Sequence, residues 1–176
     1  MDSGYAELNG NRFYYESAGS GHPLVLLHGM GWDNRAWDEH FYKFAEKYRT
    51  IRYDIRGFGQ SGPPPLSHYS HPDDLAALIA HLGLRSTYDL GHSLGGYIAV
   101  EFALTYPAMT DGLILADPAI NGFEWSPELV NAPFVRPPRL ASRTGYRGCQ
   151  GILAEIPTVR AGDEDPRYGG THYSNG

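Results

Sequence analysis

A serine flanked by glycines is the residue of this sequence best suited to chemistry. Ser93 stands at the centre of Gly-His-Ser-Leu-Gly, with Gly91 and Gly95 two positions to either side. The segment 87–90 before it has the pattern of a strand, and 94–106 after it that of a helix. Such a sharp strand-to-helix turn strains the serine backbone and exposes its hydroxyl, while the glycines prevent clashes. We therefore predict that Ser93 is a nucleophile for carbonyl groups.

Attack on a carbonyl creates an oxyanion, which needs N–H donors in fixed positions. The Leu94 N–H, at the start of the predicted helix, is one candidate. A second donor is expected from a loop that follows another strand, and His-Gly-Met-Gly at 28–31 follows the apolar run 23–27. We predict the Met30 N–H as this second donor. The alternative interpretation of 28–31 is an ordinary glycine turn.

Four segments, taken together, resemble the α/β-hydrolase superfamily. They are 28–31, 54–61, the serine turn at 91–96 and 113–117, and the resemblance covers roughly residues 5–125. The pattern is most similar to the small carboxylesterases, enol-lactonases and cofactor-free haloperoxidases. This resemblance implies hydrolysis of a small ester or lactone through an acyl-enzyme, without a cofactor, and a structural role for 54–61. A serine at the turn, in place of aspartate, argues against the dehalogenase and epoxide-hydrolase branches, whose alkyl-enzyme chemistry needs a carboxylate.

The resemblance also implies an acid and a histidine, in that order after the serine. The segment 156–165 is similar to the acid-bearing strand and loop of the family, which implies Asp165 as the acid. It has about one residue fewer between its proline and glycine than is usual, and Arg160 stands at a normally apolar position. The alternative acid is Asp117, at the end of the preceding predicted strand.

His172 is the single histidine beyond either acid, and the resemblance implies that it is the catalytic base. It follows Asp165 by seven residues, whereas the family inserts a helix and a strand there. The excursion 121–155 is also much shorter than the usual cap. The sequence therefore looks like a family member with a reduced cap and no final helix-strand unit. We expect His28 and His92 to pack, or to bond loop backbone, rather than to act as bases.

Periodicity predicts the elements that must position these residues. An α/β fold is expected: a mostly parallel sheet flanked by helices, as in a truncated α/β-hydrolase, with an N-terminal antiparallel hairpin. The predicted hairpin pairs Tyr5–Leu8 with Phe13–Glu16 across a turn at 9–11. The predicted strands are 23–27, 50–55, 87–90, 112–116 and, more weakly, 156–160. The predicted helices are 36–48, one that starts near Pro72 and ends at Gly83, and 94–106.

Composition narrows the class of protein. The 176 residues suit a single domain, 1–176, with 121–155 as a loop-rich excursion. A net charge of −6 without a basic run argues against nucleic acid, and no apolar run approaches the length of a membrane span. The single Cys149 and the absence of a leader pattern favour the cytoplasm. We expect no metal, and a homodimer is conceivable through the exposed final strand.

Two functions fit these observations. The first is an esterase-like hydrolase in which His172 activates Ser93 and the N–H groups of Met30 and Leu94 hold the oxyanion. The second is a catalytically silent α/β-hydrolase scaffold, either a binding protein or a truncated or engineered chain. The shortened C-terminal region favours the second, and the intact serine turn favours the first.

Overall fold

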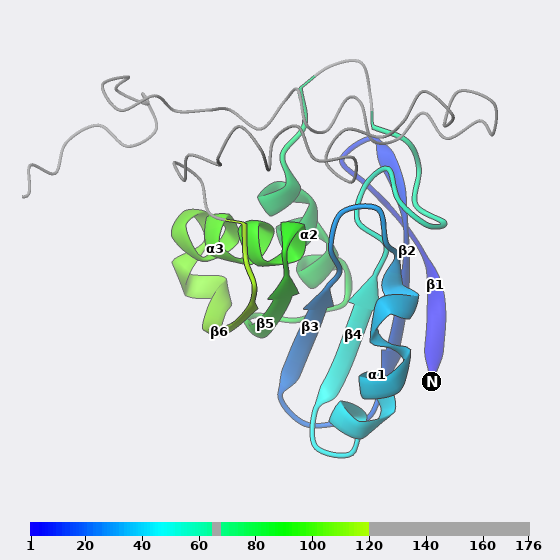
Figure 1. The fold of residues 1–176 in the computed structure, drawn as a ribbon, viewed down its shortest axis with the longest axis vertical. Helices are drawn as coiled ribbons and strands as arrows, with labels where there is room; N and C mark the ends of the chain where they lie inside the picture. The colour runs from blue at the N-terminus through cyan, green and yellow to red at the C-terminus, as the bar shows by residue number, and fades with distance from the viewer. Residues whose placement is uncertain (65–67, 120–176) are drawn as a thin grey trace, which may run out of the picture.

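The computed structural model describes residues 1–64 and 68–119. In this part of the chain six strands form one sheet, in the order β1-β2-β4-β3-β5-β6 (Figure 1). The strands are β1 (Asp2–Leu8), β2 (Asn11–Ala18), β3 (Pro23–Leu27), β4 (Arg49–Tyr53), β5 (Thr87–His92) and β6 (Thr110–Ala116). The helices are α1 (Asp38–Ala45), α2 (His71–His81) and α3 (Leu94–Thr105), with 3-10 turns η1 (Asn34–Trp37) and η2 (Pro107–Met109). The predicted α/β class is confirmed.

The sheet is antiparallel at its N-terminal end and parallel elsewhere. β1 pairs with β2 across a turn in which Asn9 and Gly10 both have positive φ, as a tight hairpin requires. β2 is antiparallel to β4, whereas β4, β3, β5 and β6 run parallel to one another. The predicted hairpin is therefore confirmed, with strands longer than expected. The carboxyl ends of the four parallel strands meet at one edge, where α/β folds commonly bind ligands.

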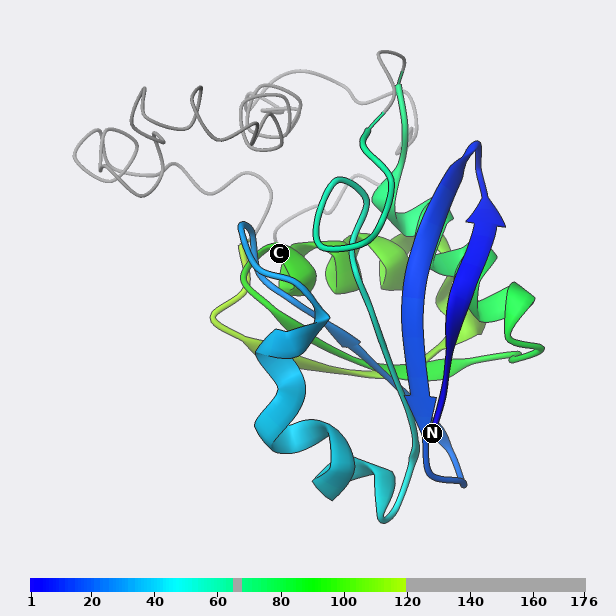
Figure 2. The same cartoon turned by 90° about the vertical axis from the view of Figure 1, so that its right-hand side faces the viewer.

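Helices cover both faces of the sheet, which buries the parallel strands from either side (Figure 2). Side chains of β3 alternate between the two layers: Leu26 packs with Phe41 of α1, and Leu27 belongs to the cluster that includes Ile98 of α3. This alternation explains why 23–27 is an uninterrupted apolar run, because a strand buried on both faces needs apolar residues at every position.

Two helix boundaries show how side chains near the ends fix the elements. The predicted helix 36–48 is divided into η1 and α1, because Asp33 caps η1 by accepting the Arg35 N–H. Helix α2 begins after Ser70, whose hydroxyl accepts the Asp73 N–H, as an N-cap residue does. It ends just before Gly83, which has φ +69°. The predicted start and end of this second helix are confirmed.

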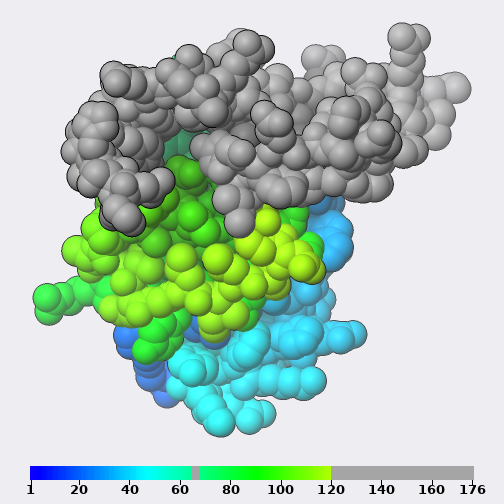
Figure 3. Space-filling model, turned by 60° about the vertical axis from the view of Figure 1, so that its left-hand side comes forward, coloured from blue at the N-terminus to red at the C-terminus, as the bar shows by residue number. Residues whose placement is uncertain are grey.

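In the described part of the chain β6 forms the free edge of the sheet. Leu113, Ile114 and Leu115 are exposed there by 36%, 53% and 40%, and the strand lies open on the face seen in Figure 3. The predicted excursion 121–155 and the predicted strand 156–160 lie outside the described residues. None of the described helices has the length and apolar character needed to cross a bilayer.

Candidate active site

Ser93 occupies the turn between β5 and α3, with φ +51° and ψ −112°. An L-residue with a side chain is strained in this conformation, and such strain concentrates at functional positions. Only two other described residues besides glycine have positive φ: Asn9, in the hairpin turn, and Asp117. The strained serine predicted from the glycine spacing is therefore present, and in the described part of the chain its hydroxyl has no hydrogen-bond partner.

The backbone around the serine turn is packed so closely that its glycine positions have no room for a side chain. A Cβ added to Gly91 would collide with the carbonyl oxygen of Gly95, and one added to Gly95 would collide with the carbonyl oxygen of Leu27. Gly96 is also crowded, because its Cβ would lie 2.7 Å from Cβ of Pro118. The backbones of β3, β5 and α3 thus touch directly, and this close packing holds the turn in its strained form.

The loop at 28–31 lies against the serine turn. A Cβ built on Gly29 would be 3.5 Å from Cβ of Ser93. Within the described residues the Met30 N–H makes no hydrogen bond, and the Leu94 N–H is the first of α3, where helix geometry supplies no acceptor. The structure thus brings both N–H groups to the region of Ser93, while their role as oxyanion donors stays a prediction.

Asp117 follows β6 and adjoins the serine turn through backbone hydrogen bonds. The Ser93 N–H donates to the Ala116 oxygen at 3.1 Å, and the Ala119 N–H donates to the Ser93 oxygen at 3.0 Å. These two bonds bracket Asp117, whose φ is +45°. The alternative acid therefore sits beside Ser93 in the described structure. Asp165 and His172 both lie outside the described residues.

His28 is bonded at both ring nitrogens and cannot act as a base. The Ile55 N–H donates to Nε2 at 3.0 Å, so Nδ1 must carry the ring proton, which it donates to the Gly29 oxygen at 2.8 Å. Burial lowers the pKa of His28 and keeps the ring neutral. The expectation that this histidine bonds loop backbone is confirmed.

The segment 54–61 is held by a buried carboxylate. One oxygen of Asp54 accepts the backbone and side-chain N–H groups of Asn34, both at 2.7 Å, and the other accepts the Gln60 N–H at 2.7 Å. The Ser61 hydroxyl donates to the Asp54 carbonyl oxygen at 2.6 Å. Because these bonds engage both carboxylate oxygens, Asp54 organises the loop, as the resemblance implied for this segment.

A small hollow of about 200 Å³ opens beside the turn, at the carboxyl ends of β3, β5 and β6. Its lining consists of His28, Trp32, Ala36, Trp37, His40, His92 and Ala116. The rings of Trp32 and His92 stack at 5.0 Å with an interplanar angle of 12°. His92 packs as expected from the sequence, whereas the two tryptophans were not among the predicted site residues. Their signal was available, since both follow the 28–31 loop within nine residues.

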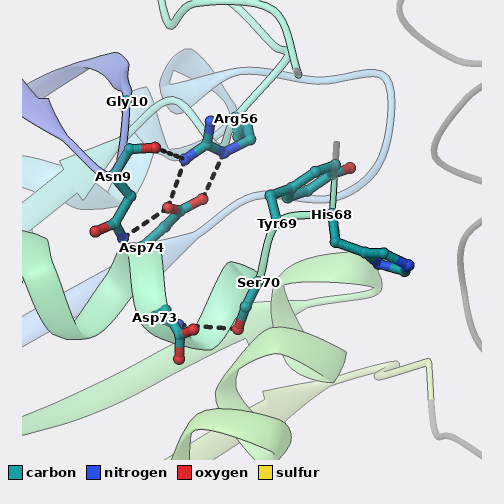
Figure 4. Close-up of a pocket in the computed structure, with 8 residues that line it drawn as sticks. All are labelled: Asn9, Gly10, Arg56, His68, Tyr69, Ser70, Asp73 and Asp74. Carbon is teal, nitrogen blue, oxygen red and sulfur yellow. Dashed lines mark hydrogen bonds and ion pairs between the residues drawn. The ribbon is translucent and has the colours of Figure 1, made fainter. Parts of the chain in front are cut away.

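A larger hollow of about 410 Å³ surrounds Arg56, but its polar groups bind one another (Figure 4). Arg56 donates two hydrogen bonds of 2.7 Å to the carboxylate of Asp74. Asn9 donates to the same carboxylate at 3.0 Å and accepts from Arg56 at 3.2 Å. This arrangement ties the β1–β2 turn to α2.

Among the described residues no three His, Cys, Asp or Glu side chains converge as metal ligands.

Known proteins with similar sequences include hydrolases and a haloperoxidase. A soluble epoxide hydrolase from a Corynebacterium species is 35% identical over 114 residues, which cover 64% of this chain and 40% of the relative. A non-heme haloperoxidase from Rhodococcus erythropolis is 37% identical over 93 residues, 50% of this chain and 33% of the relative. A putative carbamate hydrolase from Azorhizobium caulinodans is 31% identical over 121 residues, 68% and 44% of the two chains. This chain therefore spans less than half the length of these relatives.

Solved structures agree with the sequence relatives. The epoxide hydrolase CorEH superimposes with a TM-score of 0.68 and 30% identity, over 73% of this chain and 48% of that one. Est816, described as an N-acyl homoserine lactone degrading enzyme, gives a TM-score of 0.66 and 29% identity, over 86% and 56%. The model of the family described as alpha/beta hydrolase fold matches residues 22–143, more than half of the sequence. This chain belongs to the α/β-hydrolase fold family.

Proposed function

We propose that this chain is a serine hydrolase that cleaves carboxylic esters or lactones through an acyl-enzyme on Ser93. The observation that carries the proposal is the strained backbone of Ser93 in a turn closed by glycine contacts. Backbone strain of this kind at a non-glycine residue concentrates at functional sites. The likeness to a lactone-degrading enzyme over 86% of this chain supports the same class of substrate.

Ser93 also separates this proposal from epoxide hydrolysis. An alkyl-enzyme mechanism needs a carboxylate at the nucleophile position, and a hydroxyl occupies it here. In the proposed reaction the Ser93 oxygen attacks the carbonyl carbon while a base takes its proton. The N–H groups of Leu94 and Met30 bind the oxyanion, and the alcohol leaves. Water then attacks the acyl-enzyme and releases the acid.

His172 is the proposed base, with an aspartate to orient it. Asp165 is the acid that the family pattern implies, and Asp117 is the alternative. The backbone bonds that join 116–119 to the serine turn favour Asp117 as a neighbour of Ser93. The variants Asp117→Asn and Asp165→Asn distinguish the two, because loss of the true acid lowers kcat strongly and loss of the other does not.

Labelling with a fluorescent fluorophosphonate, together with hydrolysis of p-nitrophenyl acetate, tests the proposal. Wild type is expected to be labelled and active, whereas Ser93→Ala is expected to be neither. Ser20→Ala, a change at an exposed serine, is the matched control and keeps both properties. His172→Ala is expected to lower the rates of labelling and hydrolysis. If wild type is folded but Ser93 does not react, the chain is a silent scaffold, and the proposal is wrong.

A further inference from the structure

An aspartate on β5 is buried, and no cation of the described residues pairs with it. Asp89 lies on β5, four residues before Ser93, and its exposed fraction is 0%. One carboxyl oxygen accepts the Thr87 hydroxyl at 2.8 Å. The other is buried and has no hydrogen-bond partner among residues 1–64 and 68–119. A buried carboxylate costs several kcal/mol unless it is paired, so its ionised form is unstable here.

The elements around Asp89 supply no compensating charge. In the sheet it pairs with Val25 of β3 and Leu113 of β6. The buried residues of α3 are Leu94, Gly95, Gly96, Ile98, Ala99 and Phe102, all without charge. The titratable groups of the neighbouring elements that act on this region are Asp111 of β6, which pairs with His22, Tyr53 of β4, and Asp74 of α2, which pairs with Arg56. Among the described residues, no cation contacts the Asp89 carboxyl.

We propose that Asp89 is a pH-responsive element of the fold: it keeps its proton in the packed sheet, and its ionisation weakens the packing of β5 that supports the serine turn. The proton passes to solvent and no other bond changes. This property is independent of the proposed hydrolase activity, because it concerns the strand rather than the reaction of Ser93.

The direction of the pH dependence follows from the burial. Burial raises the pKa of Asp89 to about 7, while an aspartate in an unfolded chain titrates near 3.9. Below about pH 4 both states hold the proton, and the contribution to stability is complete. Between about pH 4 and 7 only the folded state holds it, so stability falls as pH rises. The equilibrium constant for unfolding should increase about tenfold per pH unit in this window and level off above it.

Urea unfolding between pH 5 and 9 tests the proposal. The unfolding constant of wild type, relative to that of Asp89→Asn, is expected to rise about fiftyfold from pH 5 to 7, because folded Asp89 is half ionised at pH 7. Asp89→Leu, which needs no partner in the core, should lose the same pH dependence, so the test survives if one variant folds poorly. Asp2→Asn, at an exposed aspartate, is the matched control and should follow wild type. Parallel profiles for wild type and both Asp89 variants would overturn the proposal.

Two neighbours should move the midpoint of this transition in opposite directions. The Thr87 hydroxyl bonds the carboxylate and lowers the pKa of Asp89, so Thr87→Val is expected to shift the midpoint upward. The charge of Asp111 raises that pKa, so Asp111→Asn is expected to shift it downward. The carboxyl ¹³C resonance of Asp89, identified by its loss in Asp89→Asn, reports the titration directly. A resonance that titrates near pH 4 contradicts the proposal, whatever the variants do.

Discussion

Two loops at the carboxyl edge of the sheet both contain residues with positive φ, but they differ in the type of residue that adopts this conformation. The loop 54–61 after β4 places its positive φ values on Gly57 and Gly59, where they cause no strain. Its polar groups are bonded to Asp54 and Ser61. The turn after β5 places its positive φ on Ser93, and in the described part of the chain that hydroxyl is unbonded.

The comparison separates residues that organise the fold from those available for chemistry. Asp54 is ionisable, buried and near the candidate site, yet both its carboxylate oxygens accept hydrogen bonds from Asn34 and Gln60. Ser93 has a strained backbone, and its hydroxyl makes no hydrogen bond to any described residue. A polar side chain whose oxygens are bonded to neighbouring loop backbone organises the fold, whereas a strained residue with an unbonded hydroxyl is a candidate for function.

The largest loss of stability is expected in the 54–61 loop, from a substitution that removes the charge of Arg56. The Arg56 guanidinium links the 54–61 loop to α2 through a buried ion pair with Asp74. Arg56→Met is expected to destabilise the protein by about 3–5 kcal/mol, because it leaves a buried carboxylate without its partner. Urea unfolding followed by circular dichroism measures the loss.

Two further variants show whether the loss of stability in Arg56→Met comes from the broken ion pair. The double variant Arg56→Met with Asp74→Leu removes both charges and should recover part of the lost stability. Arg35→Met breaks the exposed pair with Asp33 and should change stability little, since solvent screens exposed ion pairs. If Arg56→Met were as mild as Arg35→Met, the ion pair would not be what holds the loop.

A second, smaller loss of stability is expected from a substitution in the closely packed serine turn. Gly95→Ala introduces a Cβ against the carbonyl oxygen of Leu27, which belongs to a central strand and cannot move away freely. We expect a loss of about 3 kcal/mol and a displaced Ser93. Gly4→Ala on β1, whose nearest contact is the flexible end of Tyr15 at 3.4 Å, is the matched control and should cost less than 1 kcal/mol. Thermal unfolding measures the stability of both variants. Equal losses of stability would mean that the close contact between Gly95 and Leu27 does not constrain the serine turn.

Local patterns were sufficient to predict the elements and the serine turn. The apolar run 23–27, the turn at Asn9 and Gly10, and the glycines around Ser93 each act through the neighbouring backbone, so sequence spacing carries the information. The hairpin, the parallel strands and the two ends of α2 followed from such patterns. The predicted helix 36–48 differs from the structure at both ends: Asp33 caps the 3-10 turn η1 before α1 begins at Asp38, and α1 ends at Ala45.

Long-range pairings could not be predicted in the same way. Arg56 and Asp74 are 18 residues apart and meet because the loop after β4 reaches Asp74 of α2. Asp89 looks like an ordinary polar residue in the sequence, and only its place in a strand covered on both faces makes it buried and half-bonded. The hollow lined by Trp32 and Trp37 also depends on how three strand ends meet. Such features arise from packing, which periodicity does not encode.

The smallest expected effect tests whether Ser93 itself is strained. Glycine adopts φ +51° without strain, so Ser93→Gly should remove about 1–3 kcal/mol of backbone strain. Glycine also loses about 0.5–1 kcal/mol more entropy on folding, which leaves a net stabilisation of about 1 kcal/mol. Ser93→Ala is the matched control: it removes the hydroxyl but keeps a side chain at the same φ, so it should gain nothing. Both variants lose the proposed nucleophile. A more stable Ser93→Gly therefore shows that the hydroxyl is held at a cost to the fold, whereas equal stability of the two variants would mean that the turn is relaxed and that the contrast with the 54–61 loop does not mark a functional residue.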